Sequence, residues 1–173
     1  MKRKRKAGMV LLFLAVLIFF PVFSVKAQKE TKFLLELTID GKTQKEAVQG
    51  DIITVVLRLK RTDEAAGYTM YAMQDEIRYD GEFFELIEDS VTTGDGIVFS
   101  DIAMTDNYRE LYMNYLSVDG GEEWKEDTLI GSFQLRIRKR TGTSSLTNQN
   151  YAISKKDGMS TYPCEAQDVL VIL

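Results

Sequence analysis

The side chains able to carry chemistry in this sequence are carboxylates, lysines and one thiol, because histidine is absent and cysteine occurs once, as Cys164. Without an imidazole the chain cannot form a Ser-His-Asp triad, a Cys-His pair or a histidine-ligated zinc site. A single cysteine also excludes an internal disulfide, a thiolate zinc cluster and a CxxC redox pair. The chemistry that remains is acid–base catalysis by carboxylates, lysine chemistry, or binding without catalysis.

Paired carboxylates are all that a glycosidase needs, so the acidic residues are the first candidates for catalysis. The chain has 26 Asp and Glu residues, but only Asp75 is set apart by apolar surroundings. It falls on the apolar side of the alternating segment Tyr68–Tyr79, so we expect either a bulge that re-aims it or a buried, hydrogen-bonded carboxylate. Because the chain also has no glycine-rich phosphate loop and no nucleophile motif, we predict no catalytic residues, no cofactor and no enzyme activity.

An acidic segment at residues 119–127 raises the question of a calcium site, because Ca²⁺ takes oxygen ligands. Its carboxylates are Asp119, Glu122, Glu123, Glu126 and Asp127. The Asp-x-Asp-x-Asp-Gly order of calcium loops fails, since Gly121 stands where the second ligand belongs. We therefore predict a solvated acidic loop and no metal site.

The first 27 residues have the pattern of a secretory signal peptide. The basic start Met1–Lys6 is followed by the uncharged apolar run Met9–Phe23, and Val25 and Ala27 are the small residues of a cleavage site. The alternative is an uncleaved anchor, because Ala7–Val25 is nearly as long as the ~20 apolar residues that span a bilayer. Either form predicts a secreted or cell-surface protein whose folded domain is residues 28–173.

Removal of this segment would leave an acidic domain. The whole chain has a formal net charge of −4, but six of its 22 basic residues and none of its 26 acidic ones lie in residues 1–27. An acidic domain is a poor match for nucleic acid, whose affinity comes from phosphate neutralisation. We predict no nucleic-acid partner, and membrane contact only through the N-terminal segment if it stays attached.

The rest of the chain shows alternating apolar segments separated by turn signals such as Asp40-Gly41, and no amphipathic helix. Polar residues 141–150 predict a loop. The expected strands are Phe33–Ile39, Ile52–Leu59, Tyr68–Tyr79, Glu82–Ile87, Ile97–Ile102, Glu110–Val118, Thr128–Arg140, the hairpin Tyr151–Tyr162 and Val169–Leu173. This spacing predicts an all-β chain, folded as a single β-sandwich of about nine strands with jelly-roll topology.

Four motifs, in order along Phe33–Leu173, resemble the cohesin domain of bacterial cellulosome scaffolds, within the carbohydrate-binding-like β-sandwich superfamily. They are Val48-Gln49-Gly50-Asp51 before an alternating strand, Tyr79-Asp80 followed by Phe84 and Leu86, Leu129–Ile137 (LIGSFQLRI), and the hairpin before Val169–Leu173. Gly81 stands where the family usually has Pro. The resemblance implies a non-catalytic module that binds a protein partner, such as a dockerin-bearing enzyme.

Cohesins bind dockerins through one sheet, and the resemblance assigns to it Gly67–Tyr79, Ile97–Ile102, Glu110–Val118 and Thr128–Arg140. The residues expected to face outward from it are Gln74, Glu76, Arg78, Tyr112, Asn114, Leu116, Gln134, Arg136 and Arg138. Tyr112 and Leu116 would then be candidate hot spots flanked by arginines. The open alternative is a solvated face whose alternating charges only keep the protein soluble.

Polysaccharide binding on the same fold is the alternative function, and Trp124 is its candidate residue. Sugar sites use aromatic platforms, but the sequence shows no row of aromatic residues on one face. The competing interpretation is that Trp124 anchors the acidic loop by packing on the core.

Overall fold

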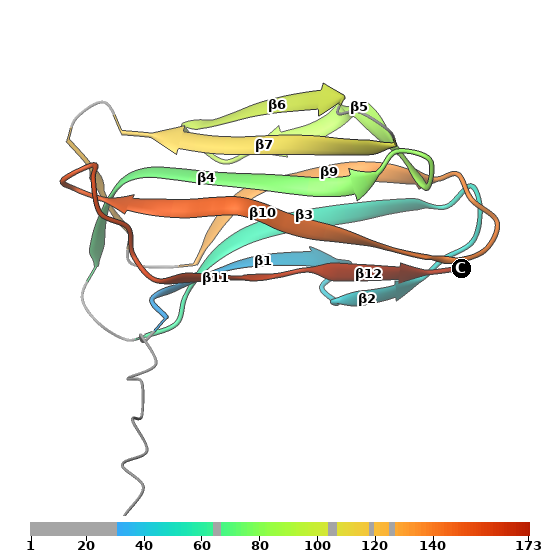
Figure 1. Ribbon diagram of the computed structural model, residues 1–173, viewed down its shortest axis with the longest axis horizontal. Coiled ribbons are helices and arrows are strands. Elements are labelled where there is room, and N and C mark those ends of the chain that lie inside the picture. Colours follow the sequence, from blue (N-terminus) through green and yellow to red (C-terminus); the bar gives the residue numbers. More distant parts are fainter. Residues whose placement is uncertain (1–30, 64–66, 104–106, 118–119, 125–126) are drawn as a thin grey trace, which may run out of the picture.

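The computed structural model describes residues 31–173, apart from 64–66, 104–106, 118–119 and 125–126. Every regular element in that part of the chain is a β-strand (Figure 1). They are β1 (Phe33–Ile39), β2 (Gln44–Glu46), β3 (Ile52–Arg61), β4 (Tyr68–Asp80), β5 (Phe84–Thr93), β6 (Ile97–Ala103), β7 (Tyr108–Leu116), β8 (Glu122–Trp124), β9 (Thr128–Ile137), β10 (Thr143–Lys155), β11 (Cys164–Gln167) and β12 (Val169–Ile172). Among these residues, none lies in a helix of the length and hydrophobicity that a membrane span requires. The predicted signal segment lies outside the described residues.

The strands form two sheets packed face to face (Figure 1). The five-stranded sheet has the order β11-β1-β3-β9-β5, and the seven-stranded sheet has the order β2-β12-β10-β4-β7-β6, with β8 paired to β4. Paired strands are antiparallel except for β1 with β11 and β2 with β12. The architecture confirms the predicted all-β sandwich with jelly-roll topology.

Period-two alternation explains why these segments are strands. In β1, Phe33, Leu35, Leu37 and Ile39 are fully buried, whereas the residues between them are half-buried. The inward side chains of both sheets meet in one apolar core. Full burial of one such side chain contributes about 1.5–3 kcal/mol, so the alternation is a strong determinant of which face turns inward.

Glycine is required at two points in this framework. The Asp40-Gly41 turn has positive φ at both residues, 52° and 73°, as a two-residue type I′ turn demands. At Gly131 on β9, a Cβ atom would lie 2.8 Å from the Thr92 carbonyl oxygen and 2.9 Å from Met113 Sδ. A side chain there would push β9 away from both β5 and the facing sheet.

The structure has more strands than the nine predicted. The three strands without a predicted counterpart, β2, β8 and β11, are only three or four residues long. The return half of the predicted hairpin, Met159–Tyr162, is not a strand and makes only an isolated bridge between Thr161 and Ser154. The larger difference is β10, because residues 143–150 are strand rather than the predicted loop. Leu146 and Ile153 of β10 are fully buried, and their burial outweighs the polar composition of the residues between them.

Candidate functional site

The outer surface of β10, β4, β7 and β6, four adjacent strands of the seven-stranded sheet, will be called the β10–β6 face (Figure 1). Antiparallel pairing sets Gln74 opposite Asn114 and Glu76 opposite Tyr112. Alternate residues of a strand share a side, so the predicted outward residues of both strands lie together. The six are Gln74, Glu76, Arg78, Tyr112, Asn114 and Leu116.

The expectation that Thr128–Arg140 belongs to the same sheet is wrong. β9 pairs with β3 and β5, so Gln134 and Arg136 project from the opposite side of the sandwich, and Arg138 follows β9 just beyond its end. The physical reason is that alternation shows only that one side of β9 is buried. It does not show which neighbours the backbone hydrogen bonds select.

The strand that completes the β10–β6 face is β10, in the place that the sequence assigned to β9. Its outward residues pair with those of β4: Thr147 with Arg78, Gln149 with Glu76, Ala152 with Gln74 and Ser154 with Ala72. These small, neutral side chains make one half of the face hydroxyl- and amide-rich. Thr147 and Gln149 fall in residues 141–150, for which the sequence predicts a loop. Ala152 and Ser154 fall in the predicted hairpin Tyr151–Tyr162, which the sequence does not assign to this sheet.

A bulge in β10 brings Asn150 onto the face. The pairing with β4 shifts between Gln149 and Ala152, and Asn150 has a φ of 45°. The Asn150 side-chain amide donates to Glu76 Oε2 at 2.6 Å, and the Asn150 backbone carbonyl oxygen accepts from Gln74 Nε2 at 2.6 Å. Gln74 and Glu76 are therefore held in place before any partner arrives. Asn tolerates positive φ better than most residues, which was the available sequence signal.

A charged group is built into the other end of the face. Glu110 projects outward between Arg78 and Tyr112 but is only 1% exposed. Its carboxylate accepts hydrogen bonds from Arg78 Nε at 2.7 Å and from the Tyr112 hydroxyl at 2.7 Å. The hydrogen bond from Tyr112 and the Arg78 guanidinium hold the pKa of Glu110 below its usual range. The same bond raises the pKa of Tyr112 to about 12, so the cluster is ionised at Glu110 and protonated at Tyr112 near neutral pH.

Apolar side chains stand exposed along the same face. Val98 is 67% exposed, Leu116 is 60% exposed and Ile102 is 45% exposed. Beside Leu116 lies a shallow hollow of about 230 Å³ over the small residues Ala72 and Ala152. Adjacent exposed apolar side chains next to a hollow are the usual signature of an interaction surface.

The outer surface of β3, β9 and β5 will be called the β3–β9 face, and its chemistry differs. Arg136 pairs with Glu85 at 3.6 Å with both side chains about half exposed, and Lys60 of β3 pairs with Glu36 at 2.7 Å. The Arg136–Glu85 pair is exposed and contributes about 0–1 kcal/mol. The alternative of a solvated, charge-paired face therefore describes this side of the molecule.

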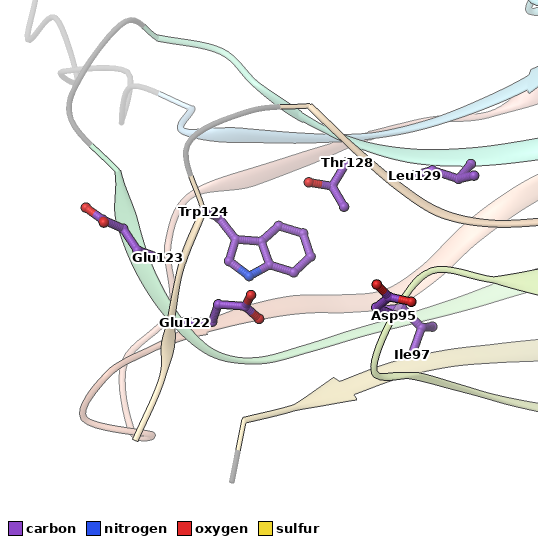
Figure 2. A pocket seen from close by; sticks show the side chains of 7 residues that line it. All are labelled: Asp95, Ile97, Glu122, Glu123, Trp124, Thr128 and Leu129. Carbon is purple, nitrogen blue, oxygen red and sulfur yellow. The ribbon is translucent and has the colours of Figure 1, made fainter. Parts of the chain in front are cut away.

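Trp124 is 8% exposed and packs edge-on against Tyr115, with the ring centroids 5.8 Å apart. The structure thus confirms the interpretation of Trp124 as a residue packed on the core. It also lines a hollow of about 450 Å³ with carboxylates around it (Figure 2). Tyr68, another aromatic residue, packs with Phe33 and Tyr162 instead, so it does not extend a platform from Trp124.

The acidic segment is not one continuous loop, since Glu122 and Glu123 belong to β8. Asp127 accepts a hydrogen bond from the Arg61 backbone amide at 3.1 Å. Asp119 and Glu126 lie outside the described residues. Within the described ranges, no three acidic or cysteine side chains are grouped in a way that could hold a metal ion.

Asp75 lies beneath the β10–β6 face, pointing into the core. It is fully buried, and neither carboxylate oxygen accepts a hydrogen bond of normal geometry. Burial raises the pKa of Asp75 to about 8, with the Glu76 backbone amide compensating only in part. The prediction of a buried carboxylate is confirmed, but the prediction that it is hydrogen-bonded is wrong. The bulge lies on the neighbouring strand β10 and leaves Asp75 inward.

No protein-family model matches the chain, and a search of curated proteins finds no match. Solved structures do match. A chain of a type I cohesin–dockerin complex from Clostridium thermocellum superposes with a TM-score of 0.60 at 13% identity, covering 83% of this chain and 94% of that one. A cohesin module of a family 33 glycoside hydrolase from Clostridium perfringens superposes with a TM-score of 0.58 at 17% identity, covering 83% of this chain and 97% of that one. A non-cellulosomal cohesin from the archaeon Archaeoglobus fulgidus superposes with a TM-score of 0.56 at 16% identity, covering 82% of this chain and 91% of that one.

At these identities the likeness concerns the fold, so the chain has the fold of cohesin modules. The three structures come from a cohesin–dockerin complex, a glycoside hydrolase and a non-cellulosomal protein. The fold therefore does not by itself specify a partner, and the surface chemistry of this chain has to carry the functional argument.

Proposed function

We propose that this chain is an exported, non-catalytic member of the cohesin family whose β10–β6 face binds a protein partner of dockerin type. The observation that carries the proposal is the exposure of Val98 and Leu116, diagonal neighbours on this face, beside the Ala72–Ala152 hollow. Ile102 adds exposed apolar surface at the other end, opposite Glu110. A structure of the same fold was solved as a cohesin–dockerin complex, which supports a protein as the partner.

The face suits an elongated partner surface such as a pair of helices. An apolar side chain of the partner fills the hollow and covers Leu116, which removes apolar area from water at about 25 cal/mol per Å². At the other end, Arg78 and Tyr112 are already oriented by Glu110 and offer hydrogen-bond donors and an aromatic edge. Preorganised groups of this kind lose little side-chain entropy on binding.

Export completes the proposal. The signal pattern of residues 1–27 places the folded domain outside the cell, free or held at the surface by that segment. There the module recruits its partner without transforming it.

The test uses residues 28–173, immobilised and exposed to secreted proteins of the source organism, with identification of retained proteins by mass spectrometry. Retained candidates are then purified and titrated against three forms: the unchanged domain, Leu116→Glu and Ile52→Glu. Ile52, on β3, is 49% exposed and provides a matched apolar-to-acidic change on the opposite sheet.

We expect Leu116→Glu to weaken binding by roughly 100-fold, as for a hot-spot residue, and Ile52→Glu to change it less than about threefold. The proposal fails if no protein is retained, or if both variants weaken binding equally. Circular dichroism of both variants checks that each remains folded.

A further inference from the structure

The hollow around Trp124 lies outside the β10–β6 face. Three segments far apart in the chain form it: the turn into β6, the short strand β8 and the start of β9. Figure 2 shows the Trp124 indole standing among Asp95, Glu122 and Leu129, with its nitrogen toward Glu122. The hollow measures about 450 Å³ and opens to solvent.

The indole N–H of Trp124 has no hydrogen-bond partner among the described residues, although its nitrogen is buried and the side chain is only 8% exposed. A buried donor without an acceptor is destabilising, and such a group in a native fold calls for an explanation. An acceptor that enters the hollow would remove this cost.

The carboxylates around the indole supply acceptors. Glu122 Oε2 accepts from the Tyr115 hydroxyl at 2.6 Å, which leaves its other oxygen available. The Asp95 carboxylate makes no hydrogen bond or ion pair to another described residue. Apolar surface borders these groups at Ile97 and at Leu129, which is 40% exposed.

A ligand for this hollow must accept one hydrogen bond, donate at least two and present an apolar edge. A lysine or arginine side chain only donates, so it leaves the indole N–H unpaired. An anion is repelled by Asp95 and Glu122. A neutral sugar ring meets all three requirements, since each hydroxyl both donates and accepts and its C–H groups cover apolar surface.

We infer that the Trp124 hollow binds one ring of a neutral carbohydrate, with Asp95 and Glu122 accepting from its hydroxyls and the indole N–H donating to one of its oxygens. No residue that lines this hollow lines the Ala72–Ala152 hollow, and Tyr115 lies between the two. The module can therefore hold a glycan and a protein partner together. One ring of this size binds with a dissociation constant on the order of 1 mM.

Trp124 is the sole tryptophan of the chain, so its fluorescence and its indole N–H resonance in NMR report on this hollow alone. Residues 28–173 are titrated with cellotetraose, xylotetraose and mannotetraose, and with tetragalacturonate as the anionic counterpart. We expect at least one neutral tetrasaccharide to shift the fluorescence saturably and to move the indole resonance downfield, and tetragalacturonate to do neither.

Two variants sharpen the test. Asp95→Asn should lower the affinity for the sugar, measured by the fluorescence titration, about tenfold. Glu85→Gln on the β3–β9 face should leave that affinity unchanged. Trp124→Phe keeps an aromatic ring but removes the N–H. Its affinity for the sugar, measured by calorimetry, should also fall about tenfold.

The inference is overturned if no neutral sugar moves either signal, which would leave water as the occupant, or if N-acetyl-lysine methylamide moves them while the sugars do not. Leu116→Glu retains the sugar response, which separates failure of this site from failure of the protein-binding face.

Discussion

The two sheets of the sandwich differ in where they bury polar side chains and expose apolar ones. In the described part of the chain, every buried side chain of the five-stranded sheet is apolar, and its outer face includes the exposed pair Arg136–Glu85. The seven-stranded sheet contains the buried polar strand residues Asp75, Glu110 and Asn148, and its outer face exposes Val98 and Leu116. Ile52 and Leu129 of the five-stranded sheet are also exposed, at 49% and 40%, but less than Val98 at 67% and Leu116 at 60%. The buried polar strand residues, which cost stability, fall only on the described part of the sheet that carries the proposed protein-binding face. The comparison suggests that recognition is maintained there at the expense of stability.

The largest expected effect concerns Asp75. Its pKa is about 8 in the folded chain and near 3.8 when exposed, so the folded state binds the extra proton between about pH 4 and pH 8. Stability therefore falls as pH rises through that window and levels off above it. Asp75→Asn removes the slope and stabilises the fold at pH 7 by up to about 4 kcal/mol.

The measurement is urea unfolding at pH 5, 7 and 9 for the unchanged domain and for Asp75→Asn. Parallel pH profiles for the two proteins would contradict the burial argument. Glu36→Gln, a pair member on the five-stranded sheet, is the control and should preserve the slope.

An intermediate effect is expected for the buried carboxylate of the β10–β6 face. Glu110→Gln weakens the hydrogen bonds from Arg78 and Tyr112 and should lower the free energy of unfolding by about 1–3 kcal/mol. The matched change on the opposite face, Glu85→Gln, should lower it by less than about 1 kcal/mol because that pair is exposed. Equal losses, measured by thermal and urea unfolding, would remove the contrast between the faces.

The smallest effect is expected for Arg136→Ala. Its partner Glu85 is more than half exposed, so the free energy of unfolding should change by about 0–1 kcal/mol. Binding of the identified partner should also stay within about twofold, as measured by calorimetry. A large loss of binding would move the interaction surface to the β3–β9 face, where the structure places Arg136.

Much of the fold could be predicted from the sequence because burial repeats with period two. The alternation of Phe33–Ile39 and the Asp40-Gly41 turn are local signals, and both appear in the structure as predicted. The orientation of Gln74, Glu76, Tyr112 and Asn114 followed from the same period. Residues 143–150 were missed because their outward hydroxyls hide an inward Leu146, and a polar strand is locally indistinguishable from a loop.

The candidate site was predicted only in part, for a related reason. Gln134, Arg136 and Arg138 were assigned to the wrong sheet because strand pairing depends on contacts between distant segments. Glu110 was not recognised as a site residue, because its burial arises only when Arg78 and Tyr112 close over it. The sequence singles out Trp124 as a candidate, but its hollow is formed by segments that the sequence does not connect.

By itself, the sequence determined the chemistry that is excluded, the all-β class and the side of each strand on which a residue lies. Residue type and period two are local properties, and they survive any rearrangement of strand order. The tertiary structure alone decided that β10 rather than β9 borders β4, that Glu110 is enclosed, and that Asp95, Glu122 and Trp124 share one hollow. These depend on which backbone edges pair and on how the two sheets pack, and both are set by the whole core at once.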